Sequence, residues 1–226
     1  MVSLPAPLRL LRVSCVALCV ALPPASVAAK PASWLNEIDA LTRDDAVHPP
    51  AAGGIVFVGS SSIRFWTTLA ADFPGLPVIG RGFGGSELAD SVYYLDRVVL
   101  PYRPRTVVLY AGENDIAAGK TPEAVASDFR EFCVRIRAAL PGTRILYIAM
   151  KPSPSRWAKR AQLEQGNALI AAACARDPRL TFVNVWPAML DASGQPRPEL
   201  FRDDRLHMKP EGYAIWIRLL TPLLQP

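Results

Sequence analysis

Residues 106–115 read Thr-Val-Val-Leu-Tyr-Ala-Gly-Glu-Asn-Asp, an apolar run that ends in a glycine and three polar residues. A short apolar run followed by loop-forming residues predicts a buried strand. In residues 122–140, apolar positions recur three and four apart, which predicts a helix that starts after Thr121 and ends at Pro141-Gly142. A buried strand, a polar loop and a helix in this order form the repeating unit of an α/β protein.

The same alternation extends in both directions from this unit. Four more apolar runs predict buried strands, at residues 55–58, 78–79, 145–148 and 180–183. Helical spacing covers residues 87–99, 159–175 and 210–223, and an amphipathic stretch begins at residue 34. Strands that alternate with helices pair in parallel, so we predict a three-layer α/β/α fold with a five-stranded parallel sheet covered on both faces.

Composition agrees with one globular domain at residues 30–226. Half of the 226 residues are hydrophobic and a fifth are charged, which excludes a disordered polymer, and no fixed-period repeat indicates a solenoid or propeller. No linker or shift in composition divides these residues. The sequence carries no signal for an oligomeric state.

The first 29 residues have the pattern of a cleaved export signal. Two arginines precede an apolar run at residues 13–22, and Val27-Ala28-Ala29 offers small residues for cleavage. A retained membrane anchor is the alternative, but Pro23-Pro24 ends the run short of the roughly 18 residues that a span needs. We therefore expect an exported protein, periplasmic or secreted, with no stable membrane span after cleavage.

The charge and the cysteines limit the partners of the exported chain. Removing residues 1–29 takes away two Arg and no acid, so the net charge falls from +5 to +3, and the remaining cations are scattered. Scattered cations do not form the basic patch that nucleic-acid binding requires. Cys133 and Cys174 remain, each on an apolar helical face, which predicts core positions. A disulfide and two buried thiols are both compatible with these positions.

Four polar segments lie at strand ends or before the last helix: Gly59-Ser60-Ser61-Ser62, Gly82-Phe83-Gly84-Gly85-Ser86, Gly112-Glu113-Asn114-Asp115 and Asp204-Arg205-Leu206-His207. Because the carboxyl ends of parallel strands meet at one edge of a sheet, we expect all four segments on one rim.

Each segment has a structural interpretation when it is taken alone. The serines suit a helix N-cap, the glycines suit turns with positive φ, and Asn-Asp suits an Asx turn. Gly80-x-Gly82-x-x-Gly85 also matches the fingerprint of a dinucleotide-binding loop, with Glu113 as the acid that would bind the ribose. However, this motif follows the second strand instead of the first, and Glu113 lies further along the chain than the usual spacing of about 20 residues. His207 could cap or pack beside the last helix, with Asp204 as a surface acid.

Together the segments supply what acyl transfer from an ester requires. Ser61, at a helix start, is a candidate nucleophile, and His207 is its candidate base, since His48 lies in a Pro-rich lead-in. Asp204, three residues before the histidine, can orient it.

Donors for a developing negative charge are available from three of the segments. They are the backbone N–H groups of Ser61 and Gly85 and the side-chain amide of Asn114. Ser60 and Ser62 are rivals to Ser61, but Ser61 stands two residues after the glycine that ends the first strand.

These four segments resemble, in order and spacing, the four blocks of the SGNH hydrolases, also called GDSL-like lipases and esterases. The resemblance implies a flavodoxin-like sheet in the order 2-1-3-4-5 and no metal or organic cofactor. It also implies Ser61 as nucleophile, His207 as base with Asp204 as its partner, and oxyanion donors at Ser61, Gly85 and Asn114. One position departs from the family pattern: Ser60 stands where Asp is usual before the nucleophile.

Residues near these segments are candidates for the substrate pocket. Arg64 follows the nucleophile, Phe83 lies among the glycines, and Trp157 ends a Pro-rich loop after the fourth strand. Such a loop could wall a pocket or simply connect two elements, with its tryptophan packed on a helix. Arg64 and Arg156 could attract an anionic or sugar-linked acyl substrate, or be solvated surface charges.

The absence of a long amphipathic lid favours a serine esterase for short acyl or O-acetyl esters, on a small molecule or a carbohydrate. A lysophospholipase, a thioesterase or an acyltransferase with the same acyl-serine intermediate is an alternative. A non-catalytic carbohydrate-binding protein is another, but simple binding does not require a nucleophile with its base.

Overall fold

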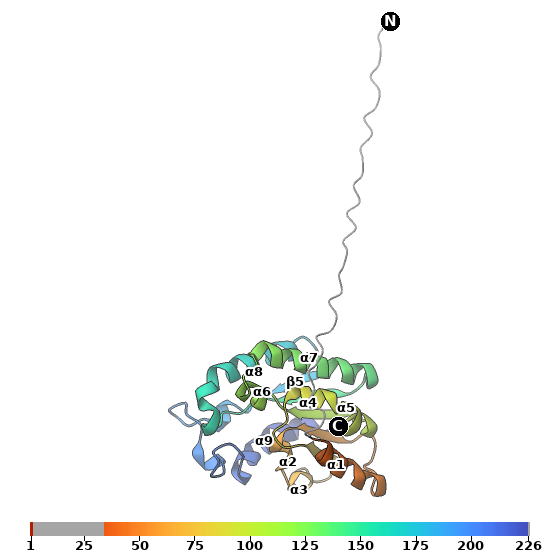
Figure 1. Ribbon diagram of the computed structural model, residues 1–226, viewed down its shortest axis with the longest axis horizontal. Helices are drawn as coiled ribbons and strands as arrows, with labels where there is room; N and C mark the ends of the chain where they lie inside the picture. Colours follow the sequence, from red (N-terminus) through yellow and green to blue (C-terminus); the bar gives the residue numbers. More distant parts are fainter. Residues whose placement is uncertain (2–33, 226) are drawn as a thin grey trace.

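The computed structural model describes residue 1 and residues 34–225, which fold into a three-layer α/β/α structure (Figure 1). Its sheet is parallel and has five strands in the order β2-β1-β3-β4-β5, so the predicted fold class and strand order are confirmed. The strands are β1 (Ile55–Gly59), β2 (Val78–Gly82), β3 (Thr106–Tyr110), β4 (Arg144–Ile148) and β5 (Leu180–Val183).

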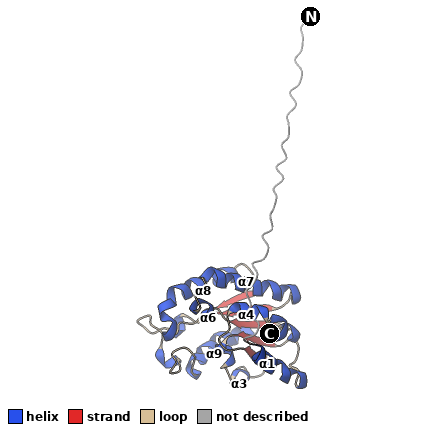
Figure 2. Cartoon of the chain, in the orientation of Figure 1, coloured by secondary structure: helices blue, strands red, loops and turns tan. Residues whose placement is uncertain are grey.

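Helices cover both faces of the sheet (Figure 2). They are α1 (Leu35–Val47), α2 (Ser61–Arg64), α3 (Leu69–Asp72), α4 (Leu88–Tyr93), α5 (Leu95–Val98), α6 (Glu113–Ala117), α7 (Pro122–Ala139), α8 (Arg160–Cys174) and α9 (Pro210–Leu224). The helix predicted at residues 87–99 is two short helices that meet at Tyr94. Single-turn helices such as α2 and α3 were not predicted, because four residues are too few to show a helical period.

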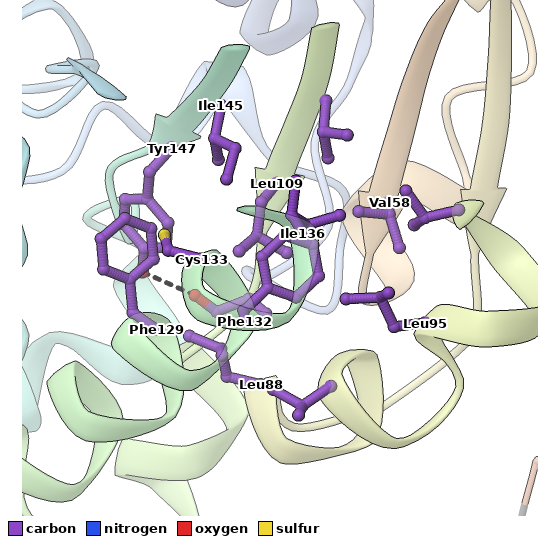
Figure 3. Close-up of a cluster of buried hydrophobic side chains, with 14 of the residues drawn as sticks. Val58, Leu88, Leu95, Leu109, Phe129, Phe132, Cys133, Ile136, Ile145 and Tyr147 are labelled. Carbon is purple, nitrogen blue, oxygen red and sulfur yellow. Dashed lines mark hydrogen bonds between the residues drawn. The ribbon is translucent and has the colours of Figure 1, made fainter. Parts of the chain in front are cut away.

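One face of the sheet packs against α1, α4, α5, α7 and α8. Phe129, Phe132 and Ile136 of α7 contact the sheet side chains Leu109 and Tyr147 in a cluster without solvent exposure (Figure 3). The Tyr147 hydroxyl in this cluster donates to the Ala111 carbonyl at 2.7 Å, which satisfies the buried polar group. This core fixes the carboxyl ends of β3 and β4.

The opposite face packs against α2, α3 and α9 through aromatic side chains. Trp216 of α9 lies 4.7 Å from the Tyr110 ring of β3 and 5.9 Å from Trp66, measured between ring centroids. Tyr213 of the same helix donates from its hydroxyl to the Ser62 carbonyl at 2.8 Å. These contacts hold α9 and α2 together on the same side of β1 and β3.

Cys133 and Cys174 occupy the core positions that their spacing predicts, and they are free thiols rather than a disulfide. They lie on α7 and α8, and burial raises the pKa of Cys133 to about 12 and that of Cys174 to about 11. The predicted export signal at residues 1–29 lies outside the described residues, apart from Met1. Within the described part of the chain, no helix combines the length and the hydropathy needed to cross a bilayer.

Candidate active site

Backbone hydrogen bonds join the predicted polar segments at the carboxyl edge of the sheet. The N–H of Ser60 donates to the Tyr110 carbonyl at 3.0 Å, and the N–H of Phe83 donates to the Gly59 carbonyl at 3.0 Å. Gly59 has φ +138°, and a Cβ there would lie 1.9 Å from the Tyr110 carbonyl oxygen. A glycine is therefore required where the nucleophile loop crosses the end of β3.

Three side chains form a continuous hydrogen-bonded chain. Ser61 Oγ lies 2.9 Å from His207 Nε2, and His207 Nδ1 lies 2.6 Å from Asp204 Oδ2. Because the carboxylate accepts from Nδ1–H, Nε2 is left as the acceptor for the serine hydroxyl. The two residues that meet here, Ser61 and His207, are 146 positions apart in the chain.

The neighbouring serines lie in different surroundings from Ser61. Ser60 is 4% exposed and Ser62 is 2% exposed, whereas Ser61 is half-buried. Ser61 is the first residue of α2, and Ser60 takes the extended backbone conformation of an N-cap. Of the three, Ser61 is the serine with a hydroxyl on the histidine, so geometry and exposure both favour it as the nucleophile.

Asp204 is held by its own loop. Its Oδ1 accepts from the N–H groups of Leu206 and His207, each at 2.9 Å. Partial burial by itself raises the pKa of Asp204, but the hydrogen bonds from the His207 ring and from these two N–H groups outweigh it and lower the pKa to about 2. The carboxylate is therefore ionised at neutral pH and keeps His207 oriented toward the serine.

The three donors that the sequence predicts for an oxyanion hole are the N–H groups of Ser61 and Gly85 and the side-chain amide of Asn114. Gly85 is exposed with φ +73°, and within residues 34–225 neither its N–H nor that of Ser61 has an acceptor. Asn114 Nδ2 donates to the Ser86 carbonyl at 3.0 Å. One amide hydrogen therefore fixes the side chain, and the second is available to a ligand. Free backbone N–H groups and an oriented side-chain amide are the kinds of donor that an oxyanion hole requires.

Asp115, the last residue of the third polar segment, has a structural role. It has no solvent exposure, and its carboxylate accepts from the Leu88 N–H at 2.9 Å and from Lys120 Nζ at 3.0 Å. Burial raises its pKa, and the Lys120 charge opposes that rise. These bonds tie α6, which carries Asn114, to α4.

A buried polar cluster below the nucleophile was not predicted from the sequence. Lys151 Nζ lies 2.6 Å from Glu113 Oε2, 3.1 Å from the Tyr110 hydroxyl and 3.4 Å from Ser62 Oγ. Tyr110 donates to the same glutamate oxygen, and Ser153 Oγ donates to Glu113 Oε1 at 3.0 Å. The cluster joins the loops that follow β1, β3 and β4.

Glu113 and Lys151 have different roles from those the sequence suggested. Glu113 is 4% exposed and its carboxylate is paired with Lys151, so it is not free to bind a ribose and the dinucleotide interpretation fails. Lys151 is 1% exposed, although it opens a loop that reads as a surface connector. The pair could have been predicted from one sequence feature: Glu113 stands three residues after the end of β3, and Lys151 stands three residues after the end of the neighbouring strand β4.

The three predicted substrate-contacting residues lie in different places. Phe83 has no solvent exposure and packs 5.8 Å from Tyr94 and 6.1 Å from Trp34, so the expectation that it lines a pocket is wrong. Arg64 is exposed, with its Nε 3.4 Å from Glu37. Trp157 is half-buried and stacks on Trp186 at 6.2 Å, where it remains a candidate for the rim.

Other ligand types have little support in the described residues. His48 is exposed, and its Nδ1 lies 3.4 Å from Asp44 rather than against one of the polar segments. In residues 34–225, no group of three or more His, Cys, Asp or Glu side chains is arranged to hold a metal ion.

Comparison with known proteins agrees with the fold and identifies the family. The model of the GDSL-like lipase/acylhydrolase family matches residues 55–215, which is more than half of the chain. The protein therefore belongs to this family and is an ester-hydrolysing serine hydrolase.

Individual proteins are similar to this chain in sequence or in fold. Human platelet-activating factor acetylhydrolase IB subunit alpha1 is 27% identical over 183 residues, which span 75% of this chain and 74% of that protein. A GDSL-like lipase from Bacteroides thetaiotaomicron superimposes with a TM-score of 0.70 at 20% identity, over 83% of this chain and 96% of that one. An acetylxylan esterase from Geobacillus stearothermophilus has a TM-score of 0.61 at 14% identity, over 77% and 95%.

Proposed function

We propose that this protein is an exported esterase that hydrolyses short acyl esters, O-acetyl esters in particular, through an acyl-Ser61 intermediate. The observation that carries the proposal is the hydrogen-bonded chain from Ser61 through His207 to Asp204, with distances of 2.9 Å and 2.6 Å. A nucleophile, a base and an orienting carboxylate at such distances are the requirements of two-step acyl transfer.

The first step forms the acyl-enzyme. Ser61 Oγ attacks the ester carbonyl carbon while His207 Nε2 takes the serine proton, and Asp204 stabilises the resulting imidazolium. The carbonyl oxygen becomes an oxyanion, which accepts from the N–H groups of Ser61 and Gly85 and from the Asn114 amide. His207 then returns the proton to the leaving alcohol as the carbon–oxygen bond breaks.

The second step reverses the first with water. His207 removes a proton from a water molecule, the hydroxide attacks the acyl carbon, and Ser61 leaves with the proton from His207. An acyltransferase would use the hydroxyl of an acceptor instead of water in this step.

Support for a short acyl group comes from proteins similar to this chain rather than from the cavity next to α2. A cavity of about 660 Å³ lies between α1 and β2, and Arg64 of the nucleophile helix lines it. Its other walls combine the charged side chains of Glu37, Asp44, Asp45 and Arg81 with the apolar side chains of Ala40, Leu41 and Ile79, so this cavity does not decide the length of the acyl chain. The acetylxylan esterase and acetylhydrolase relatives are named for acetyl substrates.

The test is hydrolysis of a nitrophenyl ester series from acetyl to palmitoyl, by the wild type and by Ser61→Ala. We expect turnover that is fastest for the acetyl ester and absent from Ser61→Ala. Ser127→Ala, on the exposed face of α7, is the matched control and should behave as the wild type. Full activity of Ser61→Ala would overturn the nucleophile assignment, and faster cleavage of long-chain esters would overturn the substrate proposal.

Export is a separate part of the proposal and rests on the sequence of residues 1–29. Expression of the full chain in a Gram-negative host should place a shortened protein, starting near Lys30, in the periplasm or medium. Mass spectrometry of the recovered protein measures the start, and an intact N-terminus in the cytosolic fraction would contradict export.

A further inference from the structure

Two loops flank the candidate catalytic histidine and contact each other. One follows β4 and covers residues 151–159, and the other covers residues 202–209 and contains His207. The Ser155 N–H donates to the Arg205 carbonyl at 3.0 Å, which joins the two loops. Arg205 has φ +56° and donates from its own N–H to the Arg202 carbonyl at 2.8 Å, so its loop is tightly turned.

These loops and the first residue of α8 carry an excess of positive charge. Lys151 is neutralised by Glu113, but the remaining six cations have no carboxylate within 4 Å among the described residues: Arg156, Lys159, Arg160, Arg202, Arg205 and Lys209. The acids on the same loops are Asp203 and Asp204, and Asp204 is engaged by His207. We call these six residues the cationic rim.

Arg202 connects the cationic rim to the catalytic histidine through one aromatic ring. Its guanidinium carbon lies 5.1 Å from the centroid of the Phe65 ring, and that ring packs edge-on against His207 at 4.8 Å. Arg202 Nε donates to the Met208 carbonyl at 3.2 Å, which fixes the direction of the side chain. Its terminal nitrogens have no partner within residues 34–225 and remain available to a ligand.

Arg64 adds a second guanidinium to the same ring. Its guanidinium carbon lies 5.6 Å from the Phe65 centroid, and its Nε is 3.4 Å from Glu37.

On the other loop, Arg156 has a buried Nε without a hydrogen-bond acceptor among the described residues. Arg156 and Arg202 are therefore both left without a carboxylate partner among the described residues, and Arg202 is the one in contact with Phe65 beside His207.

The position of Arg202 indicates which part of a substrate the rim would meet. The leaving alcohol receives its proton from His207, so it departs on the histidine side of the site, and the oxyanion donors lie at Gly85 and Asn114. Arg202 is on the histidine side because it reaches His207 through Phe65. A group bound by the rim thus belongs to the alcohol rather than to the acyl chain.

We propose that the cationic rim binds an anionic group, phosphate or carboxylate, on the alcohol part of the ester. The proposal rests on the proposed esterase function and narrows its substrate class to acyl esters of anionic alcohols. A planar guanidinium group can donate two parallel hydrogen bonds to the oxygens of a phosphate or a carboxylate. A rim of positive charge also raises the rate at which negatively charged substrates associate. Both effects weaken as salt is added.

The experiment compares three acetate esters of related phenols: phenyl acetate, 4-acetoxybenzoate and 4-acetoxyphenyl phosphate. Each kcat/KM is divided by the rate of spontaneous hydrolysis of the same ester, at low and at high salt. We expect the anionic esters to exceed phenyl acetate by about tenfold or more at low salt, with the advantage falling at high salt. A preference for only one of the two anions would support the proposal and identify that anion as the ligand.

Variants connect any preference to the rim. Arg156→Gln/Arg202→Gln should reduce the ratio of anionic to neutral kcat/KM by about tenfold. Arg130→Gln, which removes an exposed arginine from α7, should leave that ratio unchanged. A wild-type ratio near one, or a ratio that the double variant leaves unchanged, would overturn the proposal. Loss of Ser61-dependent turnover on all three esters would instead overturn the esterase function itself.

Discussion

Asp204 and His207, three residues apart, are joined by a hydrogen bond within one loop, whereas Glu113 and Lys151, 38 residues apart, form an ion pair between two segments. The side chains of the first pair are 46% and 21% exposed, and those of the second are 5% and 2% exposed. Both pairs lie at the carboxyl edge of the sheet, and both have an N–O distance of 2.6 Å.

The difference between the pairs follows from what each must do. In the proposed mechanism His207 gains and loses a proton in every cycle, and access to water limits the cost of changing its charge. The Glu113–Lys151 pair connects the segments that follow β1, β3 and β4, and the proposed mechanism requires no proton transfer by it. We therefore expect disruption of the first pair to affect the rate and disruption of the second to affect stability.

The largest expected effect is on the rate. His207→Ala should reduce kcat/KM by about 10⁴-fold or more, the scale for losing a member of a catalytic triad. The free energy of unfolding should change by less than about 1 kcal/mol, because the ring is partly exposed. Ester kinetics and urea unfolding of the same preparation measure the two effects. Activity within tenfold of the wild type would remove His207 from the mechanism.

The next effect is on stability. Lys151→Met should lower the free energy of unfolding by about 3–5 kcal/mol, because it leaves the Glu113 carboxylate buried without a counter-charge. Lys151→Met/Glu113→Gln removes both charges and should recover much of this loss. Lys159→Met, on the same loop without a carboxylate partner among the described residues, is the matched control. Equal unfolding midpoints for Lys151→Met and the wild type would show that the buried pair is not what holds the loops.

A smaller effect on the rate tests the oxyanion donor on α6. Asn114→Ala should lower kcat by about 10²–10³-fold with little change in KM, because the amide acts on charge that develops in the transition state. Asn184→Ala removes an exposed asparagine after β5 and should leave both constants unchanged. A rise in KM with kcat intact would mean that Asn114 binds the ground state instead.

The smallest effect is the pH dependence of the exposed pair. The pKa of Asp204 is about 2 in the folded protein and 3.8 ordinarily, so its hydrogen bonds stabilise the fold fully above pH 4, and this contribution is lost as the pH falls toward 2. Because the pair is exposed, we expect about 1 kcal/mol at most. Urea unfolding should show a wild-type advantage over Asp204→Asn at pH 5 that shrinks at pH 2. An advantage independent of pH would contradict this origin.

The sequence predicted the fold well where a strand is uniformly apolar. The strands at residues 106–110 and 180–183 have the predicted bounds. The strand predicted at residues 78–79 continues to Gly82, because Arg81 is buried through its ion pair with Asp45, a partner 36 residues earlier. Periodicity cannot show such a distant contact, and the strand order likewise came from the family resemblance.

The candidate site was predictable where chemistry requires particular residue types. One mechanism requires a nucleophile, a base and an orienting carboxylate, which predicts Ser61, His207 and Asp204, and the structure brings these three within hydrogen-bond distance. Phe83 was misassigned, because a residue's place in a turn does not show the direction of its side chain. Trp34 and Tyr94 surround it from elements distant in sequence.

The free thiols of Cys133 and Cys174 allow local opening of the core around α7 and α8 to be measured by chemical labelling. Both are buried, and their high pKa values keep them protonated and unreactive near neutral pH. In a chain that begins at Lys30 they are the sole cysteines, so the rate at which a thiol reagent labels the native protein measures how often α7 and α8 separate from their surroundings. That rate can be followed in the presence and absence of substrate without introducing another cysteine.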